Sequence, residues 1–122
     1  MPLNSRAKGA TGERALCDEF ERLGMLAERT VQYCGRSGDA ADVRLFGTDL
    51  HIECKRTERI TMREWVEQAT RDAHARDWVI ATKQNHRPWM IILSLEQWAR
   101  SSSHAASAMA ERSRRFNEAS GA

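Results

Sequence analysis

The run DVRLFGTDLHIECK at residues 42–55 has the pattern of two short strands joined by a tight turn. In the second strand, side chains alternate between the two faces, so His51, Glu53 and Lys55 share one face. The apolar residues between them take the other face, which we expect to be the core side. Pairing of the two strands as a hairpin would place Asp42 beside Glu53.

Two carboxylates and an ammonium group gathered at one point indicate a particular chemistry. Carboxylate oxygens are the ligands that hard divalent cations prefer, and a lysine beside such a cation can orient or activate a water. The alternative is a solvated strand face with a surface ion pair, because an E-x-K triplet near an acid is common in charged strands. The surrounding pattern favours the metal site, since a further acid, Glu13, lies on the apolar side of the preceding helix.

The composition is that of one globular domain of 122 residues, with 41% hydrophobic and 30% charged residues. No apolar run reaches the length of a membrane span, and the polar N-terminus lacks the apolar stretch of a signal peptide. The three cysteines have no framework spacing and no C-x-x-C pair, which argues for reduced thiols and against zinc. We therefore expect a cytoplasmic protein that does not associate with membranes.

Positive charge is unevenly distributed along the chain, although the net charge is only +2. Basic residues gather near the start, after the second strand and near the end: Arg6, Lys8 and Arg14; Arg56 and Arg59; Arg112, Arg114 and Arg115. Each cluster is either a surface that contacts phosphates or an ordinary solvated surface, and both interpretations remain open.

The apolar periodicity predicts a single domain over residues 1–122 with elements in the order α-β-β-β-α-β-β-α. The expected elements are a flexible arm over 1–7, a helix over 8–23 ended by Gly24, strands over 25–34, 42–46 and 50–55, a helix over 61–75, strands over 78–82 and 89–93, a C-terminal helical segment over 95–116 and a fraying tail over 117–122. Thr61 with Glu64, and Ser94 with Gln97, form capping-box patterns before the two later helices.

The two later strands are apolar on both faces and need cover on both sides. The expected fold class is therefore α/β, with a central mixed β-sheet of about five strands flanked by helices. In the first helix, Leu16, Phe20 and Leu23 form the predicted buried stripe, and Glu13 lies on the same stripe. Glu13 is either part of a polar site at the edge of the core or a first-turn glutamate that stabilises the helix dipole.

A longer pattern extends through the first half of the chain. Its members are Lys8-Gly9, Gly12-Glu13-Arg14, Arg29, Gly38-Asp39-Ala40-Ala41-Asp42-Val43 and Ile52-Glu53-Cys54-Lys55. In order and spacing, from about residue 6 to residue 57, this pattern resembles the PD-(D/E)xK nuclease superfamily. Within the superfamily it most resembles the archaeal- and phage-type Holliday junction resolvases. The resemblance implies a restriction-endonuclease-like core and a single nuclease domain.

The resemblance also implies a role for each matched residue of the site. Asp42 and Glu53 would bind one or two Mg²⁺ ions, for which Mn²⁺ substitutes, and the backbone carbonyl of Cys54 would add a ligand. Lys55 would position or polarise the attacking water and steady the pentacovalent phosphate. Glu13 would complete the acidic cluster, with a metal-bound water as one way of reaching the ion. Glu13, Asp42, Glu53 and Lys55 are thus the candidate catalytic residues.

Other matched residues surround this set. The candidate DNA-binding residues are Lys8, Arg14, Arg29 and Arg56, and Gln68 matches a helix position where such nucleases often keep a polar residue near the site. Ala41 stands where the superfamily has proline, and we expect little loss because proline there only stiffens the chain before the acid. Asp39 either shares the role of Asp42 or is a loop acid in a Gly-rich turn.

The predicted function is that of a magnesium-dependent, structure-selective DNA endonuclease that resolves four-way (Holliday) junctions in a bacterial or phage-infected cell. Two equivalent cuts in branched DNA imply a homodimer. Trp65 and Trp98 are candidates for its interface, whereas Trp78 and Trp89 are assigned to the core. The alternatives are a repair or restriction-type nuclease acting on linear, flap or single-stranded DNA, and a DNA-binding module that kept the fold and lost the chemistry.

Overall fold

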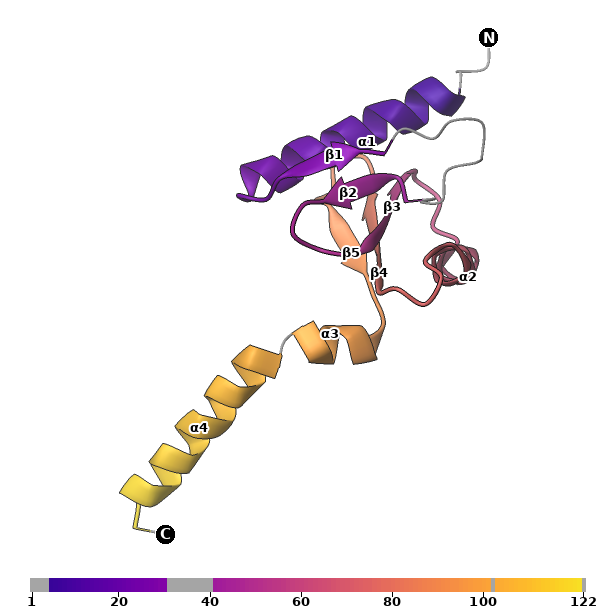
Figure 1. Cartoon of the computed structure of the whole chain (residues 1–122). Coiled ribbons are helices and arrows are strands. Elements are labelled where there is room, and N and C mark those ends of the chain that lie inside the picture. Colours follow the sequence, from indigo (N-terminus) through magenta and orange to yellow (C-terminus); the bar gives the residue numbers. More distant parts are fainter. Residues whose placement is uncertain (1–4, 31–40, 102, 122) are drawn as a thin grey trace. The chain divides into compact units, whose positions relative to one another are not determined.

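The computed structural model describes residues 5–30, 41–101 and 103–121 of the chain. These residues belong to two compact units, Met1–Ile92 and Leu93–Ala122. The first unit holds a five-stranded sheet and two helices, and the second unit holds two further helices (Figure 1). Among the described helices, none combines the length and the apolar character that crossing a membrane requires.

The observed elements follow the predicted order. The first unit contains α1 (Ser5–Arg22), β1 (Ala27–Arg29), β2 (Val43–Leu45), β3 (His51–Arg56), α2 (Met62–Asp72), β4 (Trp78–Lys83) and β5 (Met90–Ile92). The second unit contains α3 (Leu95–Ser101) and α4 (Ser103–Ala119). The predicted helical segment at the C-terminus is thus two helices, separated within the run of serines. Its second helix extends to Ala119, three residues beyond the predicted end at residue 116.

The five strands lie in the sheet in chain order, β1-β2-β3-β4-β5. The first three form an antiparallel meander, β3 and β4 are parallel, and β5 returns antiparallel to β4. Parallel strands need a crossover connection, and α2 supplies it between β3 and β4. The mixed five-stranded sheet predicted from the sequence is therefore confirmed.

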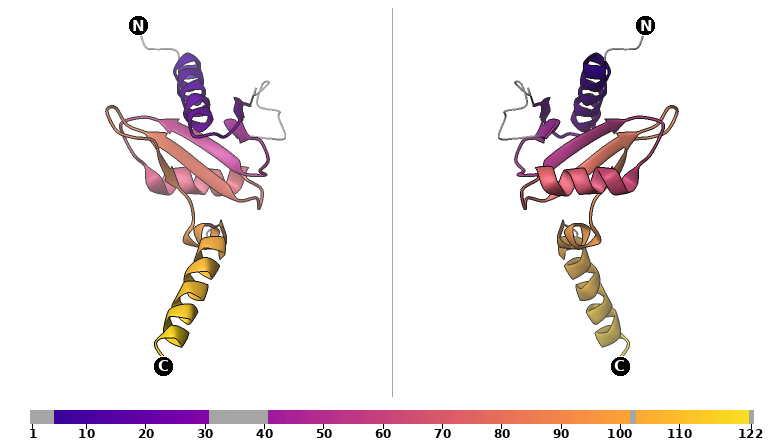
Figure 2. Two further views of the ribbon diagram at one scale, coloured as in Figure 1. Left: turned by 90° about the vertical axis from the view of Figure 1, so that its left-hand side faces the viewer. Right: turned by 90° about the vertical axis from the view of Figure 1, so that its right-hand side faces the viewer.

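Helices α1 and α2 cover opposite faces of this sheet (Figure 2). On the α1 face the buried cluster is Leu16, Val43, Leu45, Ile52 and Ala81, and on the α2 face it is Trp65, Ala69 and Ile80. Both faces of β3 are therefore covered. The prediction that only the face of Ile52 meets the core was too narrow, because His51 and Glu53, on the other face, are 0% and 2% exposed.

Helix α1 ends at the predicted glycine. Gly24 has a φ of +88°, in the left-handed region that favours glycine. Its N–H donates to the carbonyl of Glu21, and the N–H of Met25 donates to the carbonyl of Phe20, which together make a Schellman motif. The chain leaves the helix there, and Leu23 is 56% exposed. The prediction that Leu23 belongs to the buried stripe of α1 was therefore wrong.

Other element boundaries differ from the prediction. Helix α1 begins at Ser5, so the predicted arm over 1–7 is partly helical, and its first four residues lie outside the described part. The predicted strand over 25–34 is confirmed at Ala27–Arg29, and residues 31–34 lie outside the described part.

The two predicted helix caps have different outcomes. Ser94 caps α3, because its Oγ accepts from the N–H of Gln97 at 3.0 Å. Thr61 precedes α2 but makes no side-chain cap hydrogen bond, so the capping box predicted for Thr61 and Glu64 does not form.

Candidate active site

Asp42 lies just before β2, and both its main chain and its side chain are bound to β3. Its backbone N–H donates to the carbonyl of Ile52 at 2.9 Å. Its Oδ2 accepts from the backbone N–H of Cys54 at 2.8 Å. The pairing of Val43 with Ile52 sets this register, and the hairpin brings Asp42 next to Glu53 as predicted.

The electrostatics of Asp42 show how closely the acids are gathered. The pKa of Asp42 is raised from 3.8 to about 7, first by burial and then by the negative charge of Glu53. A hydrogen bond to Glu53 and the charge of Glu13 act in the same direction, whereas the N–H of Cys54 opposes the rise. Without a cation, the cluster therefore tends to retain a proton near neutral pH.

Glu13 reaches this cluster because α1 approaches β3 closely one residue earlier. A Cβ placed on Gly12 would lie 2.8 Å from the Cβ of Arg56 and 3.8 Å from the Sγ of Cys54. Glycine is therefore needed for the close approach of the helix to the strand. Glu13 lies in the middle of α1 rather than in its first turn, which excludes a first-turn role at the helix dipole.

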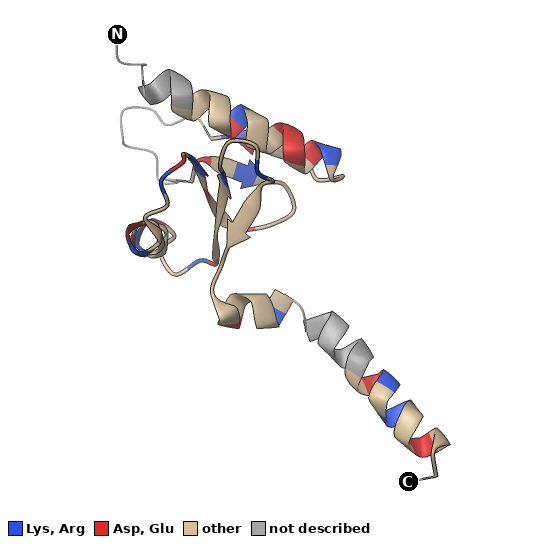
Figure 3. Cartoon of the chain, turned by 180° about the vertical axis from the view of Figure 1, so that it is seen from behind, with Lys and Arg blue, Asp and Glu red and all other residues tan. Residues whose placement is uncertain are grey.

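Arg29 on β1 balances part of this negative charge. Its Nε donates to Oε2 of Glu13 at 2.9 Å, and 33% of its side chain stays exposed. Arg14 follows Glu13 on α1 and is exposed. Lys8 lies in α1, but its side chain is outside the described part of the structure. Figure 3 shows basic residues mixed with acidic ones on the second half of α1, so this surface is not uniformly positive.

Arg56, at the end of β3, is held by the loop after β4. Its Nη1 donates to the carbonyl of Lys83 at 3.0 Å, and its Nη2 donates to Oδ1 of Asn85 at 2.7 Å. Its guanidinium group also lies 3.7 Å from the carboxylate of Glu58. These contacts give Arg56 a structural role beside the DNA-binding role predicted for it.

Lys55 and Gln68 meet across the gap between β3 and α2. The Nζ of Lys55 donates to Oε1 of Gln68 at 2.8 Å. The backbone of Lys55 is also fixed, because the hydroxyl of Thr82 on β4 donates to its carbonyl at 2.8 Å. The sequence predicted Gln68 to lie near the site, and the structure places it in direct contact with the lysine.

His51 and Asp72 are neighbours of the site to which the sequence assigned no role, although it placed His51 on the same strand face as Glu53. Nε2 of His51 lies 2.7 Å from Oε1 of Glu53, and both side chains are buried. One potential ligand atom from each of His51, Glu53 and Asp72 lies within 4.8 Å of the other two. The available signal was spacing, because Asp72 follows Gln68 by four residues and so lies on the same face of α2.

The structure does not test the roles predicted for Cys54 and Asp39. The thiol of Cys54 has its pKa raised to about 12, first by burial and then by the charge of Asp42, so it stays protonated. The ligand role predicted for the Cys54 carbonyl stays a prediction. Asp39 lies outside the described residues.

A family model described as "Phage putative PDDEXK endonuclease" matches residues 4–119. The chain belongs to this phage PDDEXK endonuclease family. Among solved structures, the 1.6 Å structure of Hjc, a Holliday junction resolvase from the archaeal hyperthermophile Archaeoglobus fulgidus, has the same fold. The TM-score is 0.54 at 21% identity, over 69% of this chain and 75% of that one. A comparison with curated proteins finds no match.

These comparisons confirm the superfamily and the fold predicted from the sequence. The protein is a metal-dependent nuclease of the PDDEXK type.

Proposed function

We propose that this PDDEXK endonuclease resolves four-way DNA junctions in a magnesium-dependent reaction, with Glu13, Asp42, Glu53 and Lys55 as its catalytic residues. The convergence of the three acids supports this proposal most directly. Burial, together with their mutual repulsion, raises the pKa of Asp42 to about 7. Carboxylates held this closely destabilise a fold unless they bind a cation, so the cluster is better explained by a metal than by packing.

The donor set fits magnesium. Mg²⁺ prefers oxygen ligands and commonly takes one or two carboxylates while keeping several waters. Asp42 and Glu53 would hold the ion, the carbonyl of Cys54 would add a ligand, and Glu13 would act directly or through a water. When bound, Mg²⁺ neutralises charge on the phosphate and acidifies a water, and Mn²⁺ is expected to substitute for it.

Lys55 would orient the attacking water and stabilise the developing negative charge. Its hydrogen bond to Gln68 occupies one of the three ammonium hydrogens, which leaves two for water and phosphate. Gln68 would therefore hold the ammonium group in one position. Of these two residues, only Lys55 would contact the reacting phosphate.

The DNA backbone would be bound by basic residues near the acids. Arg29 is suited to this because it already lies against Glu13 and keeps a third of its side chain exposed. Arg14 and Lys8 would extend the contact along α1, and Arg56 would contribute from the end of β3. Their role would be to position the backbone, since contacts with phosphates carry no sequence information.

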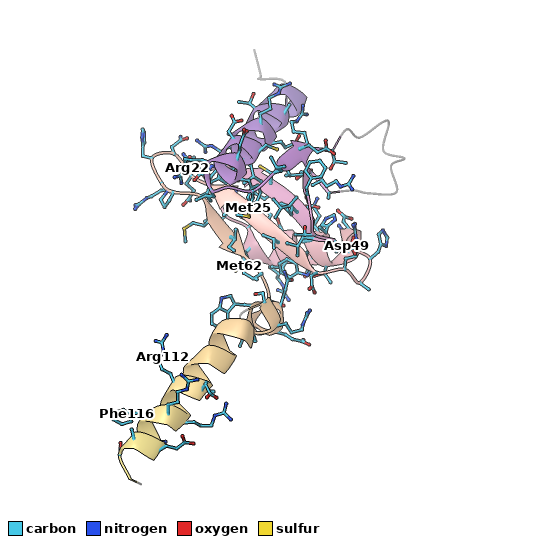
Figure 4. The ribbon with its side chains drawn as sticks, turned by 60° about the vertical axis from the view of Figure 1, so that its left-hand side comes forward. Arg22, Met25, Asp49, Met62, Arg112 and Phe116 are labelled. Atoms are coloured by element: carbon cyan, nitrogen blue, oxygen red, sulfur yellow. The ribbon has the colours of Figure 1, made fainter. Side chains whose placement is uncertain are left out.

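A four-way junction is the preferred substrate, and a homodimer is the preferred assembly. The structural neighbour with the same fold is described as a Holliday junction resolvase, which supports the substrate. Two symmetric cuts are most simply made by a two-fold dimer. Trp65 is 6% exposed and belongs to the core, whereas Trp98, Leu95 and Phe116 are 55%, 79% and 73% exposed and are available for an interface. Figure 4 labels Phe116 on α4.

The cytoplasm is the expected compartment, because the substrate is intracellular DNA. Cys17 and Cys54, the two cysteines in the described residues, are free thiols. Such thiols fit a reducing compartment.

The test compares cleavage of a labelled four-way junction with cleavage of a duplex of the same arm sequence, with and without Mg²⁺. We expect paired cuts in the junction only with Mg²⁺, no cuts with Asp42→Asn, and cleavage slowed by about 10²–10⁴-fold with Lys55→Ala. Asp49→Asn is the matched control, because Asp49 lies in the exposed turn after β2 (Figure 4).

Each other outcome rejects a specific part of the proposal. Equal cutting of duplex and junction would favour a nuclease for linear DNA. Tight junction binding without cleavage, in both Mg²⁺ and Mn²⁺, would indicate an inactive binding module. Full cleavage by both site variants would reject the proposed catalytic residues.

A further inference from the structure

We propose that His51 is a positioning residue of the active site, which holds the carboxylate of Glu53 in the orientation that binds the metal ion. This inference rests on the proposed role of Glu53 as a metal ligand, and it adds a residue to which the proposed reaction gives no role. His51 would touch neither the ion nor the DNA. It would act only through its hydrogen bond to Glu53.

The backbone of β3 fixes the spacing between these two side chains. His51 and Glu53 are two residues apart on the strand, so their side chains lie on the same face. The N–H of His51 donates to the carbonyl of Asp77 at 2.9 Å, and His51 lies opposite Trp78 of β4. Glu53 lies opposite Ile80 of the same strand. Because β3 is paired with both β2 and β4, the two residues cannot separate without breaking the sheet.

The side chains of this pair form a hydrogen bond in a buried environment. Nε2 of His51 lies 2.7 Å from Oε1 of Glu53, and the two residues are 0% and 2% exposed. An ionised carboxylate only accepts hydrogen bonds, so Nε2 carries the hydrogen of this bond. Water does not compete for the bond at this depth, and a hydrogen bond is stronger where water is excluded. His51 therefore restricts the rotation of the Glu53 carboxylate.

Packing alone does not explain a histidine at this position. His51 is one of the largest fully buried side chains in the described structure, beside the apolar Ile52, Ile80 and Val43. Its Nδ1 is buried and has no hydrogen-bond partner among the described residues. Burying a polar nitrogen without a partner costs stability, and an apolar side chain of similar size would avoid this cost. What such a side chain could not supply is the hydrogen bond to Glu53.

Glu53 links His51 to the acidic cluster, because Glu53 is also hydrogen-bonded to Asp42. Oδ2 of Asp42 in turn accepts from the backbone N–H of Cys54 at 2.8 Å. Carboxylates that bind a metal are commonly oriented by an outer hydrogen bond of the kind that His51 donates. Loss of such a partner typically weakens metal affinity or activity by about 10–100-fold. We therefore expect the loss of His51 to be felt first in metal binding.

Lys55, on the same face of β3, is held in a comparable way. Its ammonium group donates to Oε1 of Gln68 on α2 at 2.8 Å. Each of the two functional side chains on this strand face thus has a partner of its own, Gln68 for the ammonium group and His51 for the carboxylate. Because the two partners lie on different elements, a change at His51 should alter metal binding without releasing Lys55.

Three substitutions separate the hydrogen bond from the shape of the ring. In His51→Gln the side-chain amide extends about as far as Nε2 does and can donate to Glu53. The amide of His51→Asn extends only about as far as Nδ1, and His51→Met is apolar and of similar length, so neither makes this bond. The control is His86→Asn, because His86 is exposed in the turn before β5 at a φ of 60°, a conformation that Asn tolerates.

The measurement is Mn²⁺ binding to the full chain, without DNA and without a histidine tag, followed by the electron paramagnetic resonance signal of free Mn²⁺. We expect His51→Met and His51→Asn to raise the dissociation constant by about tenfold or more, and His51→Gln to stay within about threefold of the wild type. In single-turnover cleavage, the first two variants should need correspondingly more Mg²⁺ for half the maximal rate. Their affinity for the junction in EDTA should be unchanged, a split that general destabilisation would not produce.

Two results would overturn the proposal. One is a folded His51→Met that binds Mn²⁺ as tightly as the wild type does. The other is an equal loss of affinity in His51→Gln and His51→Asn, because the hydrogen bond would then not be the cause. Urea unfolding in EDTA shows whether each variant is folded. If His51→Met does not fold, the comparison of His51→Gln with His51→Asn decides.

The outcome is separable from that of the proposed function. Mn²⁺ binding that is weakened by Asp42→Asn but not by His51→Met would reject the role of His51 alone. Binding that is weakened by His51→Met, in a protein that cuts no DNA, would reject the nuclease reaction alone. Binding that neither substitution weakens would reject the metal site at these acids, and the role of His51 with it.

Discussion

Replacing Asp42 with asparagine should stabilise the metal-free protein while abolishing cleavage. Between pH 4 and pH 7 the folded chain holds a proton that the unfolded chain has released, because the pKa of Asp42 rises from 3.8 to about 7 on folding. Raising the pH removes this proton from the folded state only, so the free energy of unfolding falls through this range. At about 1.4 kcal/mol per pH unit, the loss above pH 7 is on the order of 4 kcal/mol.

Asparagine should remove this loss without removing the anchoring of the side chain. Its amide oxygen can still accept from the N–H of Cys54, which now donates to Oδ2 at 2.8 Å. It carries no charge to repel Glu53 and Glu13. We expect Asp42→Asn to exceed the wild type by about 1–4 kcal/mol at pH 8, the lower values applying because the proton is shared with Glu53. The difference should shrink towards zero at pH 4.

The measurement is urea unfolding in EDTA, followed by tryptophan fluorescence from pH 4 to pH 8. Asp49→Asn is the control, because its carboxylate is 88% exposed and should leave the pH profile unchanged. A wild-type stability that stays flat or rises with pH relative to Asp42→Asn would refute the reasoning. Adding Mg²⁺ at pH 8 should then raise the stability of the wild type and not that of the variant.

Four further changes test the fold and the catalytic site. Gly12→Ala should destabilise the fold by about 1–3 kcal/mol in urea, because its Cβ would lie 2.8 Å from that of Arg56, whereas Gly9→Ala, with nothing within 4 Å, should not. Lys55→Ala should lower single-turnover cleavage by about 10²–10⁴-fold at unchanged junction affinity, and equal loss of binding would contradict its catalytic role. Gln68→Leu should lower the single-turnover cleavage rate less than Lys55→Ala does, because it removes only the hydrogen bond that holds the ammonium group of Lys55. A larger loss of rate for Gln68→Leu than for Lys55→Ala would contradict this positioning role. Removing divalent cations with EDTA should abolish cleavage, and Mg²⁺ or Mn²⁺ should restore it.

The hairpin at the centre of the site was predictable because its determinants are local. Alternation in the run over 42–55 sets which side chains share a face, and the turn sets the register of the two strands. The approach of Asp42 to Glu53 follows from these two features alone. Gly24 was predictable for the same reason, since a helix end that needs positive φ is marked by its residue type.

The second layer of the site depends on packing that no local pattern reports. The side chains of His51 and Asp72 lie close together only because α2 packs on the face of β3 that carries His51, with a particular rotation of the helix about its own axis. That rotation is set by Trp65 and Ala69, which are buried against Ile80. The apolar side of α2 could be predicted from the sequence, but the position of the helix along β3 could not. The capping box at Thr61 failed similarly, because capping depends on a backbone geometry that the motif does not determine.

The same packing explains why the acids cannot relieve their repulsion by moving apart. Asp42 is bound to β3 through both its main chain and its side chain. Glu13 is carried by a helix whose contact with β3 leaves no room for even one extra methyl group at Gly12. Glu53 lies on the central strand and is 2% exposed. Since each acid is fixed by a different element, the cluster is preorganised, and a cation or a proton must balance its charge. Near pH 7 and below, a proton on Asp42 balances this charge. Metal affinity should therefore rise steeply with pH as Asp42 ionises. Isothermal titration with Mg²⁺ at pH 6 and pH 8 measures this directly, and equal affinities at the two values would show that the proton and the metal do not compete.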